Sequence, residues 1–284
     1  MAGVVLGVDG GGSGCRAALC DRTGRVLGHG TGGPANATSD FEEACASVGT
    51  AIGVALAAAG LAPDRIAGGF LGLAGMRYPR QAEAMIARLD LRNCTVTKDR
   101  PTMMAGALGG ADGAVVALGT GSFVGVVRGG VTRAVGGWGL QLSDQASAAW
   151  IGRAGLAATL EAVDGMQATG ALARAMLDRW GGDPASIVDF AATARPADYG
   201  VLAPVVTGSA GDDPAAAAIL RAAAAWIDRA LSALGHDDSL PVVMTGGTGA
   251  TVQPWLARDG RQFMTPAGSA LDGALWLARR AVWG

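Results

Sequence analysis

The chain is poor in the residues that build metal centres and disulfide frameworks. Its 284 residues include two histidines and four cysteines, and no two cysteines form a C-x-x-C pair. A zinc site is therefore not expected. Scattered cysteines fit reduced thiols better than disulfides, so we expect a cytoplasmic protein.

Strong charge and long apolar runs are also lacking. The formal net charge is −2, and Lys98 is the one lysine, so no basic surface for nucleic acid is expected. No basic segment precedes the short N-terminal apolar run, and we expect neither a signal peptide nor a stretch of about 20 residues that could span a membrane. Half of the residues are hydrophobic, enough for one large domain or two lobes.

Glycine, in contrast, is abundant, and residues 9–14 read Asp-Gly-Gly-Gly-Ser-Gly between two apolar runs. The pattern predicts a strand, a glycine-rich turn and a second strand. The N–H groups of such a turn can face phosphate oxygens, and Asp9 at the strand end indicates a metal ion or a water that accompanies the anion. It is neither a Walker A loop nor a Rossmann fingerprint. A glycine-rich hairpin without a ligand is the alternative.

Apolar periodicity and turn residues predict an alternation of strands and helices along the first part of the chain. After three strands within residues 3–31, Ser39 or Asp40 starts a helix that ends at Gly60. The further strands and helices alternate, with expected ranges 66–73, 79–89, 94–97 and 101–108. Asp99 follows the last of these strands.

The second part begins near Gly113 and repeats the opening pattern. A strand at 114–118 leads into Gly119-Thr120-Gly121-Ser122 and two more strands, 123–127 and 131–135. Two copies of one unit can place two such turns across a cleft, and chance in a glycine-rich chain is the alternative. The rest is expected to be helical at 146–163, 167–180, 186–193, 199–207, 214–234, 251–257 and 270–281, with a strand at 240–245.

Several short motifs in this order resemble the sugar kinase, Hsp70 and actin-like ATPases. More narrowly, they are similar to the N-acetylglucosamine kinase and glucosamine kinase branch, which includes ATPase activators of the BadF/BadG type. The motifs are glycine-rich or polar segments at 7–13, 33–36, 119–122, 136–139, 143–147 and 245–247, together with Asp99 and a closing helix of small residues.

The resemblance implies an α/β fold of two ribonuclease-H-like lobes hinged around an ATP cleft. The lobes would comprise residues 1–110 with the closing helix 269–284, and residues 111–268. It also implies ATP and Mg²⁺ as cofactors, a small-molecule sugar as substrate and a homodimer. Neither nucleic acid nor a membrane is an expected partner.

The same resemblance assigns roles to the glycine-rich turns. The first turn would hold the transferring phosphate and Asp9 would support Mg²⁺, while the second turn and a later loop would hold the rest of the nucleotide. Tight turns without ligands are the alternative. The implied nucleotide-binding residues are Gly10, Gly11, Gly12, Ser13, Gly119, Thr120, Gly121, Ser122, Gly246 and Gly247.

The sugar side depends on polar residues after strands and in loops. Asp99 matches the base that accepts the proton of the attacking hydroxyl, or caps the next helix, or does both. Asn36 matches a residue that contacts sugar hydroxyls, and Trp138 would stack on the ring or anchor packing. Asp144 and Gln145 lie where the family has Gly-Asp-Glu-Gly-Ser. Here Gln replaces Glu and both glycines are replaced, and Asp144 is alternatively a helix N-cap.

We therefore predict an ATP-dependent kinase that phosphorylates N-acetylglucosamine or glucosamine at the 6-hydroxyl. Two alternatives remain. One is an ATPase that activates a partner enzyme, although the cysteines show no cluster-binding arrangement. The other is a non-catalytic sugar or nucleotide sensor.

Overall fold

The computed structural model describes residues 3–256 and 260–284. The chain forms two compact units, unit 1 comprising Met1–Ala111 and Pro266–Gly284, and unit 2 comprising Asp112–Thr265. The two lobes expected from the sequence, residues 1–110 with 269–284 and residues 111–268, remain a prediction.

Unit 1 is built on a five-stranded sheet of its described residues with the order β3-β2-β1-β4-β5. β1, β2 and β3 form an antiparallel meander, whereas β4 and β5 run parallel to β1. The elements are β1 (Val4–Gly11), β2 (Gly14–Cys20), β3 (Val26–Gly32), α1 (Phe41–Ala59), η1 (Pro63–Arg65), β4 (Ile66–Leu73), α2 (Pro79–Arg88), β5 (Cys94–Lys98), α3 (Arg100–Leu108) and α11 (Ala270–Trp283).

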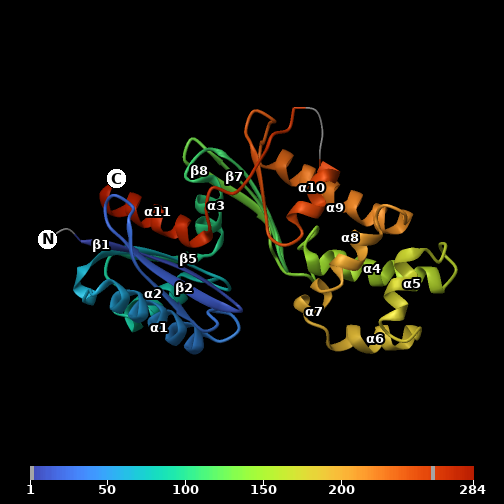
Figure 1. Cartoon of the computed structure of the whole chain (residues 1–284), viewed down its shortest axis with the longest axis horizontal. Coiled ribbons are helices and arrows are strands. Elements are labelled where there is room, and N and C mark those ends of the chain that lie inside the picture. Colours follow the sequence, from blue (N-terminus) through green and yellow to red (C-terminus); the bar gives the residue numbers. More distant parts are fainter. Residues whose placement is uncertain (1–2, 257–259) are drawn as a thin grey trace. The chain divides into compact units, whose positions relative to one another are not determined.

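Helices cover both faces of this sheet, with α1 and α2 on one side and α3 and α11 on the other (Figure 1). The alternation of β1 matches this arrangement. Leu6 and Val8 belong to the core beneath α1, and Val5 packs with Leu275 of α11. A Cβ at Gly7 would lie 2.9 Å from Leu275 Cδ2, so a glycine is needed for α11 to lie this close. Because side chains alternate, Asp9 shares the face of Val5 and Gly7.

Helix α1 requires a correction. By length and composition alone it could cross a membrane, whereas no such stretch was expected from the sequence. Among the described residues it is the one helix of this kind. Its packing is that of a core helix. Asp40 caps its start, Gly60 ends it in a left-handed conformation, and Ala51 and Ala55 lie against the glycines of β3.

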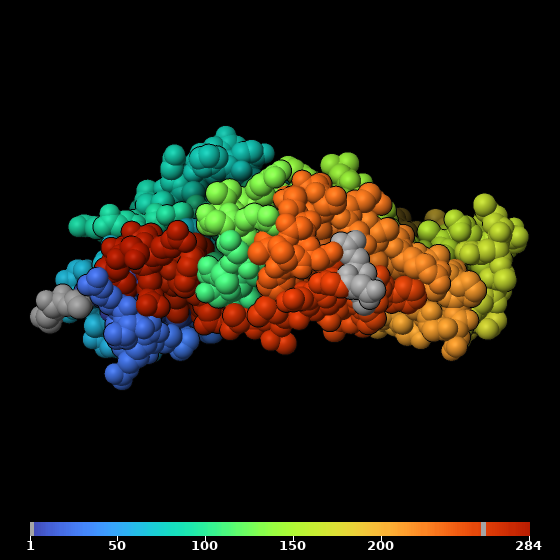
Figure 2. Space-filling model, turned by 90° about the horizontal axis from the view of Figure 1, so that it is seen from above, coloured from blue at the N-terminus to red at the C-terminus, as the bar shows by residue number. Residues whose placement is uncertain are grey.

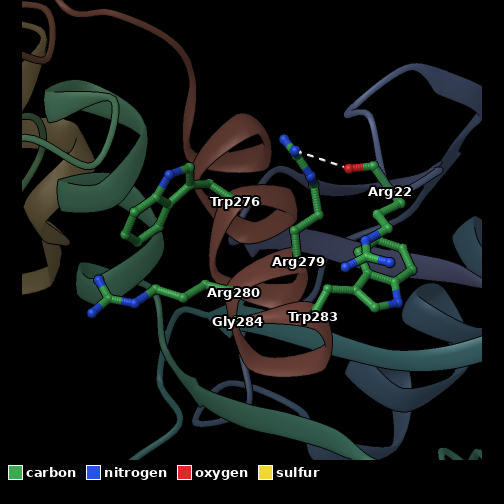
Figure 3. A pocket seen from close by; sticks show the side chains of 6 residues that line it. All are labelled: Arg22, Trp276, Arg279, Arg280, Trp283 and Gly284. Atoms are coloured by element: carbon green, nitrogen blue, oxygen red, sulfur yellow. Dashed lines mark hydrogen bonds between the residues drawn. The ribbon is translucent and has the colours of Figure 1, made fainter.

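The outer face of α11 lies at the surface of unit 1, dark red in Figure 2. There Arg279 Nη2 donates to the Arg22 carbonyl oxygen at 3.1 Å, and Arg280 lies over the Trp276 ring (Figure 3). These side chains border a hollow of about 430 Å³ together with Trp283.

Unit 2 repeats the sheet, with the order β10-β9-β6-β7-β8 in its described residues. β6, β7 and β8 form the antiparallel meander, and β9 and β10 run parallel to β6. The elements are β6 (Gly113–Leu118), β7 (Ser122–Arg128), β8 (Val131–Gly136), α4 (Ala148–Val163), α5 (Ala171–Asp178), α6 (Pro184–Thr193), α7 (Pro196–Gly200), α8 (Ala203–Ser209), α9 (Pro214–Ala233), β9 (Val242–Thr245), α10 (Gly249–Leu256) and β10 (Phe263–Met264).

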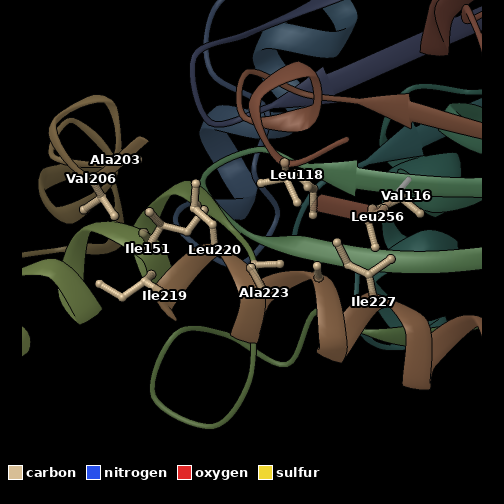
Figure 4. Packing of buried hydrophobic residues seen from close by; sticks show 14 of the residues in the cluster. Val116, Leu118, Ile151, Ala203, Val206, Ile219, Leu220, Ala223, Ile227 and Leu256 are labelled. Carbon is tan, nitrogen blue, oxygen red and sulfur yellow. The ribbon is translucent and has the colours of Figure 1, made fainter. Parts of the chain in front are cut away.

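The core of unit 2 joins this sheet to the helical segment. Figure 4 shows Leu220 of α9 beside Ile151 of α4, and Ile227 of α9 near Leu256 of α10 and Val116 of β6, all fully or nearly fully buried. The aliphatic contact fixes α9 across the sheet face.

Most predicted elements of both units are confirmed. Several differ, among them α4, which begins at Ala148 and not at residue 146, and the short helix η1, which was not expected. The helix expected at 167–180 is shorter, at Ala171–Asp178. The one expected at 199–207 is divided into α7 and α8, because Pro204 cannot continue a helix bond. The two-residue strand β10 was missed. Ala257, the expected last residue of the 251–257 helix, lies outside the described residues.

Candidate functional site

The site in unit 1 lies where β1, β4 and β5 end. Backbone hydrogen bonds join the end of β1 to the segments that follow β3 and β4. Ala35 N–H donates to the Gly11 carbonyl at 2.8 Å, Ala74 N–H donates to the Gly10 carbonyl at 2.8 Å, and Ala37 N–H donates to the Ala74 carbonyl at 2.9 Å. The glycine-rich turn, the Asn36 loop and the segment after β4 therefore form one platform.

The glycines of the first turn differ in their surroundings. A Cβ at Gly10 would lie 2.6 Å from Leu73 Cδ2, so this glycine serves packing. At Gly11 and Gly12 no atom lies within 4 Å of an added Cβ. These two positions border open space, and a bulky anion can approach their backbone closely.

A cavity of about 410 Å³ opens beside this turn. Among its described lining residues, Arg16 carries a positive charge, and Asp9 and Asp99 carry carboxyl groups. Asp9 lies directly opposite Arg16 in the β1–β2 ladder, and Arg16 Nη2 donates to Asp9 Oδ2 at 2.5 Å. Arg16 was not among the residues predicted for the site. Asp9 and Arg16 are equally far from the centre of the turn, however, and this is the spacing of cross-strand partners in a hairpin.

Asp99 lies between the end of β5 and the start of α3. Burial raises the pKa of its carboxyl above the ordinary value, and the neighbouring Asp9 charge adds to this, while Arg100 opposes it. Asp99 occupies the N-cap position but its side chain makes no capping hydrogen bond, so the capping interpretation is wrong for the side chain. The carbonyl of Asp99 instead accepts from Thr102 Oγ1 at 2.7 Å. A half-buried carboxylate whose side chain makes no capping hydrogen bond is suited to accept a proton.

Asn36 shapes the loop that follows β3. Its Oδ1 accepts from the backbone N–H groups of Thr38 and Ser39, at 2.9 and 3.2 Å. This is the behaviour of a loop asparagine, and it leaves the Nδ2 amide group, for which the described part of the chain shows no acceptor. One side chain can therefore both fix the loop and donate to a ligand.

In unit 2 the second glycine turn follows β6 and is braced from two sides. Ala148 N–H donates to the Gly119 carbonyl at 2.9 Å, and Ser122 Oγ donates to the Gln145 carbonyl at 2.6 Å. On the other side Thr248 Oγ1 donates to the Leu118 carbonyl at 2.9 Å. The turn, the segment before α4 and the loop after β9 thus form one platform in this unit.

Asp144 is buried within that platform, at 6% exposure. Its Oδ1 accepts from Gly139 N–H at 3.3 Å, and a Cβ at Gly121 would lie 2.9 Å from its Oδ2. The helix N-cap is Ser147, whose Oγ accepts from Trp150 N–H, and α4 starts at Ala148. The expected helix start at Ala146 and the alternative of Asp144 as N-cap are therefore wrong.

Trp138 lies in the same glycine-rich segment and is 74% exposed. It is not a packing anchor of the described structure. Gln145 is half-buried, and its Oε1 accepts from Ser143 Oγ at 3.3 Å, so its amide N–H groups remain for another partner.

Unit 2 has a cavity of its own, of about 680 Å³, which was not expected from the sequence. It is lined by α9, by α10 and by the end of α8 with the segment that leads into α9. Helix α10 begins two residues after Gly247. Arg221 of α9 lies over the Trp255 ring at 5.7 Å in its lining. A guanidinium and an indole provide flat faces on which a planar base can stack.

The described residues contain no group of three His, Cys, Asp or Glu side chains able to hold a metal ion. Mg²⁺ needs no such group, because it usually keeps its waters and binds one or two carboxylates plus substrate phosphates. Asp9, with a side chain 17% exposed in the cavity, provides such a carboxylate.

Two sheets of the same strand order, each with a glycine turn after its first strand, define the ribonuclease-H-like fold of the actin-like ATPases and sugar kinases. The chain belongs to the BadF/BadG/BcrA/BcrD ATPase family, whose model matches residues 6–256. This confirms the family and the α/β fold expected from the sequence.

Individual relatives agree with this assignment. Glucosamine kinase GspK of Vibrio cholerae serotype O1 is 33% identical over 279 residues, 96% of this chain and 95% of that protein. A structure from Chromobacterium violaceum, described as a candidate N-acetylglucosamine kinase, is 33% identical with a TM-score of 0.84, covering 98% and 99% of the two chains. A ROK family glucokinase from Streptomyces griseus, at 19% identity and a TM-score of 0.55 over 98% of this chain and all of that one, shares the fold.

Proposed function

We propose that this protein is an ATP-dependent amino-sugar kinase acting on the 6-hydroxyl of N-acetylglucosamine or glucosamine. A sugar kinase is the class that its relatives support. The observation that carries the proposal is the unit 1 cavity, where the half-buried Asp99 carboxyl shares a lining with Asp9 and an open glycine turn. A proton acceptor beside a phosphate-sized turn is what phosphoryl transfer to a hydroxyl requires.

In the proposed reaction the sugar hydroxyl oxygen attacks the γ-phosphorus of ATP. An oxygen–phosphorus bond forms, the bond from the γ-phosphorus to the β–γ bridging oxygen breaks, and ADP leaves. The hydroxyl proton passes to the Asp99 carboxylate. The products are the sugar 6-phosphate, ADP and one proton, which Asp99 releases to water.

The nucleotide side uses both glycine turns. Gly11, Gly12 and Ser13 of unit 1 border the open space for the transferring phosphate, and Gly10 shapes the turn. Asp9 would hold Mg²⁺ through its water shell, and the bound cation would neutralise phosphate charge. In unit 2 the residues expected to hold the remaining nucleotide are Gly119, Thr120, Gly121, Ser122, Gly246 and Gly247, with the Arg221–Trp255 cavity for the base.

The sugar side is assigned to Asn36, Trp138, Asp144 and Gln145. The exposed Trp138 ring offers an apolar face for the sugar. The amide groups of Asn36 and Gln145 are neutral donors, which suits hydroxyl or carbonyl acceptors. The homodimer implied by the family resemblance and the cytoplasmic location expected from the scattered cysteines form part of the same proposal.

A coupled ADP-release assay over a panel of hexoses tests the activity. N-acetylglucosamine, glucosamine, glucose, mannose and N-acetylmannosamine would be compared, and the phosphorylated carbon would be assigned by ³¹P–¹H correlation NMR. Turnover of at least one amino sugar at C6 is expected. No turnover with any sugar would overturn the proposal.

The same assay separates the two alternatives. An activator ATPase would turn over ATP without sugar dependence and would contain iron, whereas Cys15, Cys20 and Cys45 are buried and, with Cys94, form no metal-binding group in the described chain. A sensor would bind sugar in calorimetry without releasing ADP.

A further inference from the structure

Asp9 forms an ion pair with Arg16. The proposed function requires the same Asp9 carboxylate to hold the Mg²⁺ that accompanies the nucleotide. Arg16 Nη2 lies 2.5 Å from Asp9 Oδ2, and the two residues are paired directly across the β1–β2 ladder. Direct cross-strand partners have their Cβ atoms about 5 Å apart, so this pairing is built into the register of the sheet.

The two partners differ in freedom. The Asp9 side chain is 17% exposed, whereas the Arg16 side chain is 56% exposed. The carboxylate is therefore held within the cavity, and the guanidinium sits on a long stem that reaches solvent. Breaking the pair would cost little, because exposed ion pairs stabilise proteins weakly.

The charges in the cavity explain why the guanidinium is needed after the pair separates. Asp9 and Asp99 line the cavity together with Arg16. An incoming triphosphate would add several negative charges to a cavity that already holds two carboxyl groups. A guanidinium binds phosphate oxygens through two parallel N–H bonds, which makes Arg16 suited to offset that charge.

We propose that Arg16 exchanges partners when the nucleotide binds: it neutralises Asp9 in the free protein and pairs with an oxygen of the transferring phosphate in the complex. The exchange rests on the proposed function. It also discourages Asp9 from taking up a divalent cation before the nucleotide arrives, so metal and nucleotide enter together.

Isothermal titration calorimetry of Arg16→Gln tests the exchange without relying on turnover. Two ligands are titrated separately, Mn²⁺ alone and the non-hydrolysable analogue AMPPNP with Mg²⁺. Loss of the guanidinium is expected to tighten Mn²⁺ binding by about 2- to 5-fold, because a repelling charge is removed. It is expected to weaken AMPPNP binding by about 10- to 100-fold, because a charged hydrogen bond is lost.

The opposite signs distinguish this exchange from a structural role. If Arg16 only holds Asp9 in place, both affinities fall together, and if it has no role, neither changes; either result overturns the inference. Arg16→Lys keeps the positive charge but lacks the two parallel N–H donors of the guanidinium. Its AMPPNP affinity is expected to lie between that of the unaltered protein and that of Arg16→Gln. Arg133→Gln, at an exposed position of β8, is the control for loss of a surface arginine.

Sugar-dependent turnover by the unaltered protein is measured in parallel. Turnover with unchanged Arg16→Gln affinities would overturn the exchange and leave the kinase standing. Absent turnover with the opposite affinity changes would overturn the kinase and leave the exchange as a property of nucleotide binding.

Discussion

The two glycine turns occupy equivalent places in the two sheets but have different chemistry. The turn after β1 is open at Gly11 and Gly12 and is flanked by Asp9 and Arg16. The turn after β6 has no charged residue on its own strands near the turn, and a buried carboxylate, Asp144, packs against Gly121 from another segment.

The difference shows how two copies of one sheet can present two chemically different turns. In unit 1 the charges of Asp9 and Arg16 belong to the strands themselves, so sheet register fixes them beside the cavity. In unit 2 the loops before α4 and after β9 brace the turn through Ala148 and Thr248. Under the proposed function, the open, charged turn would receive the phosphate that is transferred, and the braced turn would hold the phosphates that remain in ADP.

Removing the proposed base should have the largest effect on activity. Asp99→Asn is expected to lower kcat by about 10²- to 10⁴-fold, the usual contribution of a general base. Its stability at neutral pH should be unchanged or higher, because burial disfavours the charged carboxylate that the substitution removes. Thermal unfolding and the coupled assay check both, with the exposed Asp64→Asn as control. Full activity in Asp99→Asn would exclude Asp99 as the base.

The raised pKa of Asp99 also sets a pH dependence. The base works only when ionised, so the acidic limb of kcat/KM should lie above the ordinary aspartate range. The contribution of Asp99 to the free energy of unfolding changes with pH in the opposite sense to its contribution to activity. Folding favours the neutral form, so the contribution of Asp99 is fully present below the unfolded pKa and is lost as pH rises through the folded pKa. Asp99→Asn should remove that loss, which pH-dependent unfolding measures.

Gly246 and Gly247 of unit 2 allow two roles of the loop after β9 to be tested separately, the packing that holds the loop and the open space for a ligand. Gly246 has φ +85°, and a Cβ there would clash with the Leu118 carbonyl, whereas nothing lies within 4 Å at Gly247. Gly246→Ala is expected to lower the free energy of unfolding by about 2–5 kcal/mol.

Gly247→Ala should leave the unfolding free energy within about 0.5 kcal/mol and raise the KM for ATP. Urea unfolding and initial rates measure the two effects. Equal stability of the two variants would contradict the account of a braced loop.

The exposed tryptophan should contribute a smaller, sugar-specific effect. Trp138→Ala is expected to raise the sugar KM by about 2- to 10-fold, the magnitude of one ring contact, and to leave the ATP KM unchanged. Leu142→Ala, 83% exposed in the same segment, is the control for altered loop packing. An unchanged sugar KM in Trp138→Ala would remove Trp138 from the sugar site.

Much of this fold could be predicted from the sequence because local signals and tertiary packing agree. Asp40 and Gly60 bound α1 as their capping chemistry predicts, and β4 begins and ends where its apolar run does. The start of α4 was misplaced because Ala146 looks like a helix former, whereas its left-handed conformation is imposed by the loop that Asp144 braces. Arg16 and the Arg221–Trp255 cavity depend on register and on helix packing, which a one-dimensional pattern does not contain.

Ala146 itself allows the smallest and most specific test of the bracing in unit 2. It has φ +67° and is fully buried, at a position where the family pattern has glycine. In Ala146→Gly the relief of left-handed strain, about 1–2 kcal/mol, is offset by lost burial and by chain entropy, each about 0.5–1 kcal/mol. The unfolding free energy should therefore change by less than about 1 kcal/mol. Ala149→Gly removes an equally buried methyl group from the α4 helix, where no strain is relieved, and should cost about 1.5–2 kcal/mol. Equal losses in the two variants would show that the loop between Asp144 and α4 holds no backbone strain.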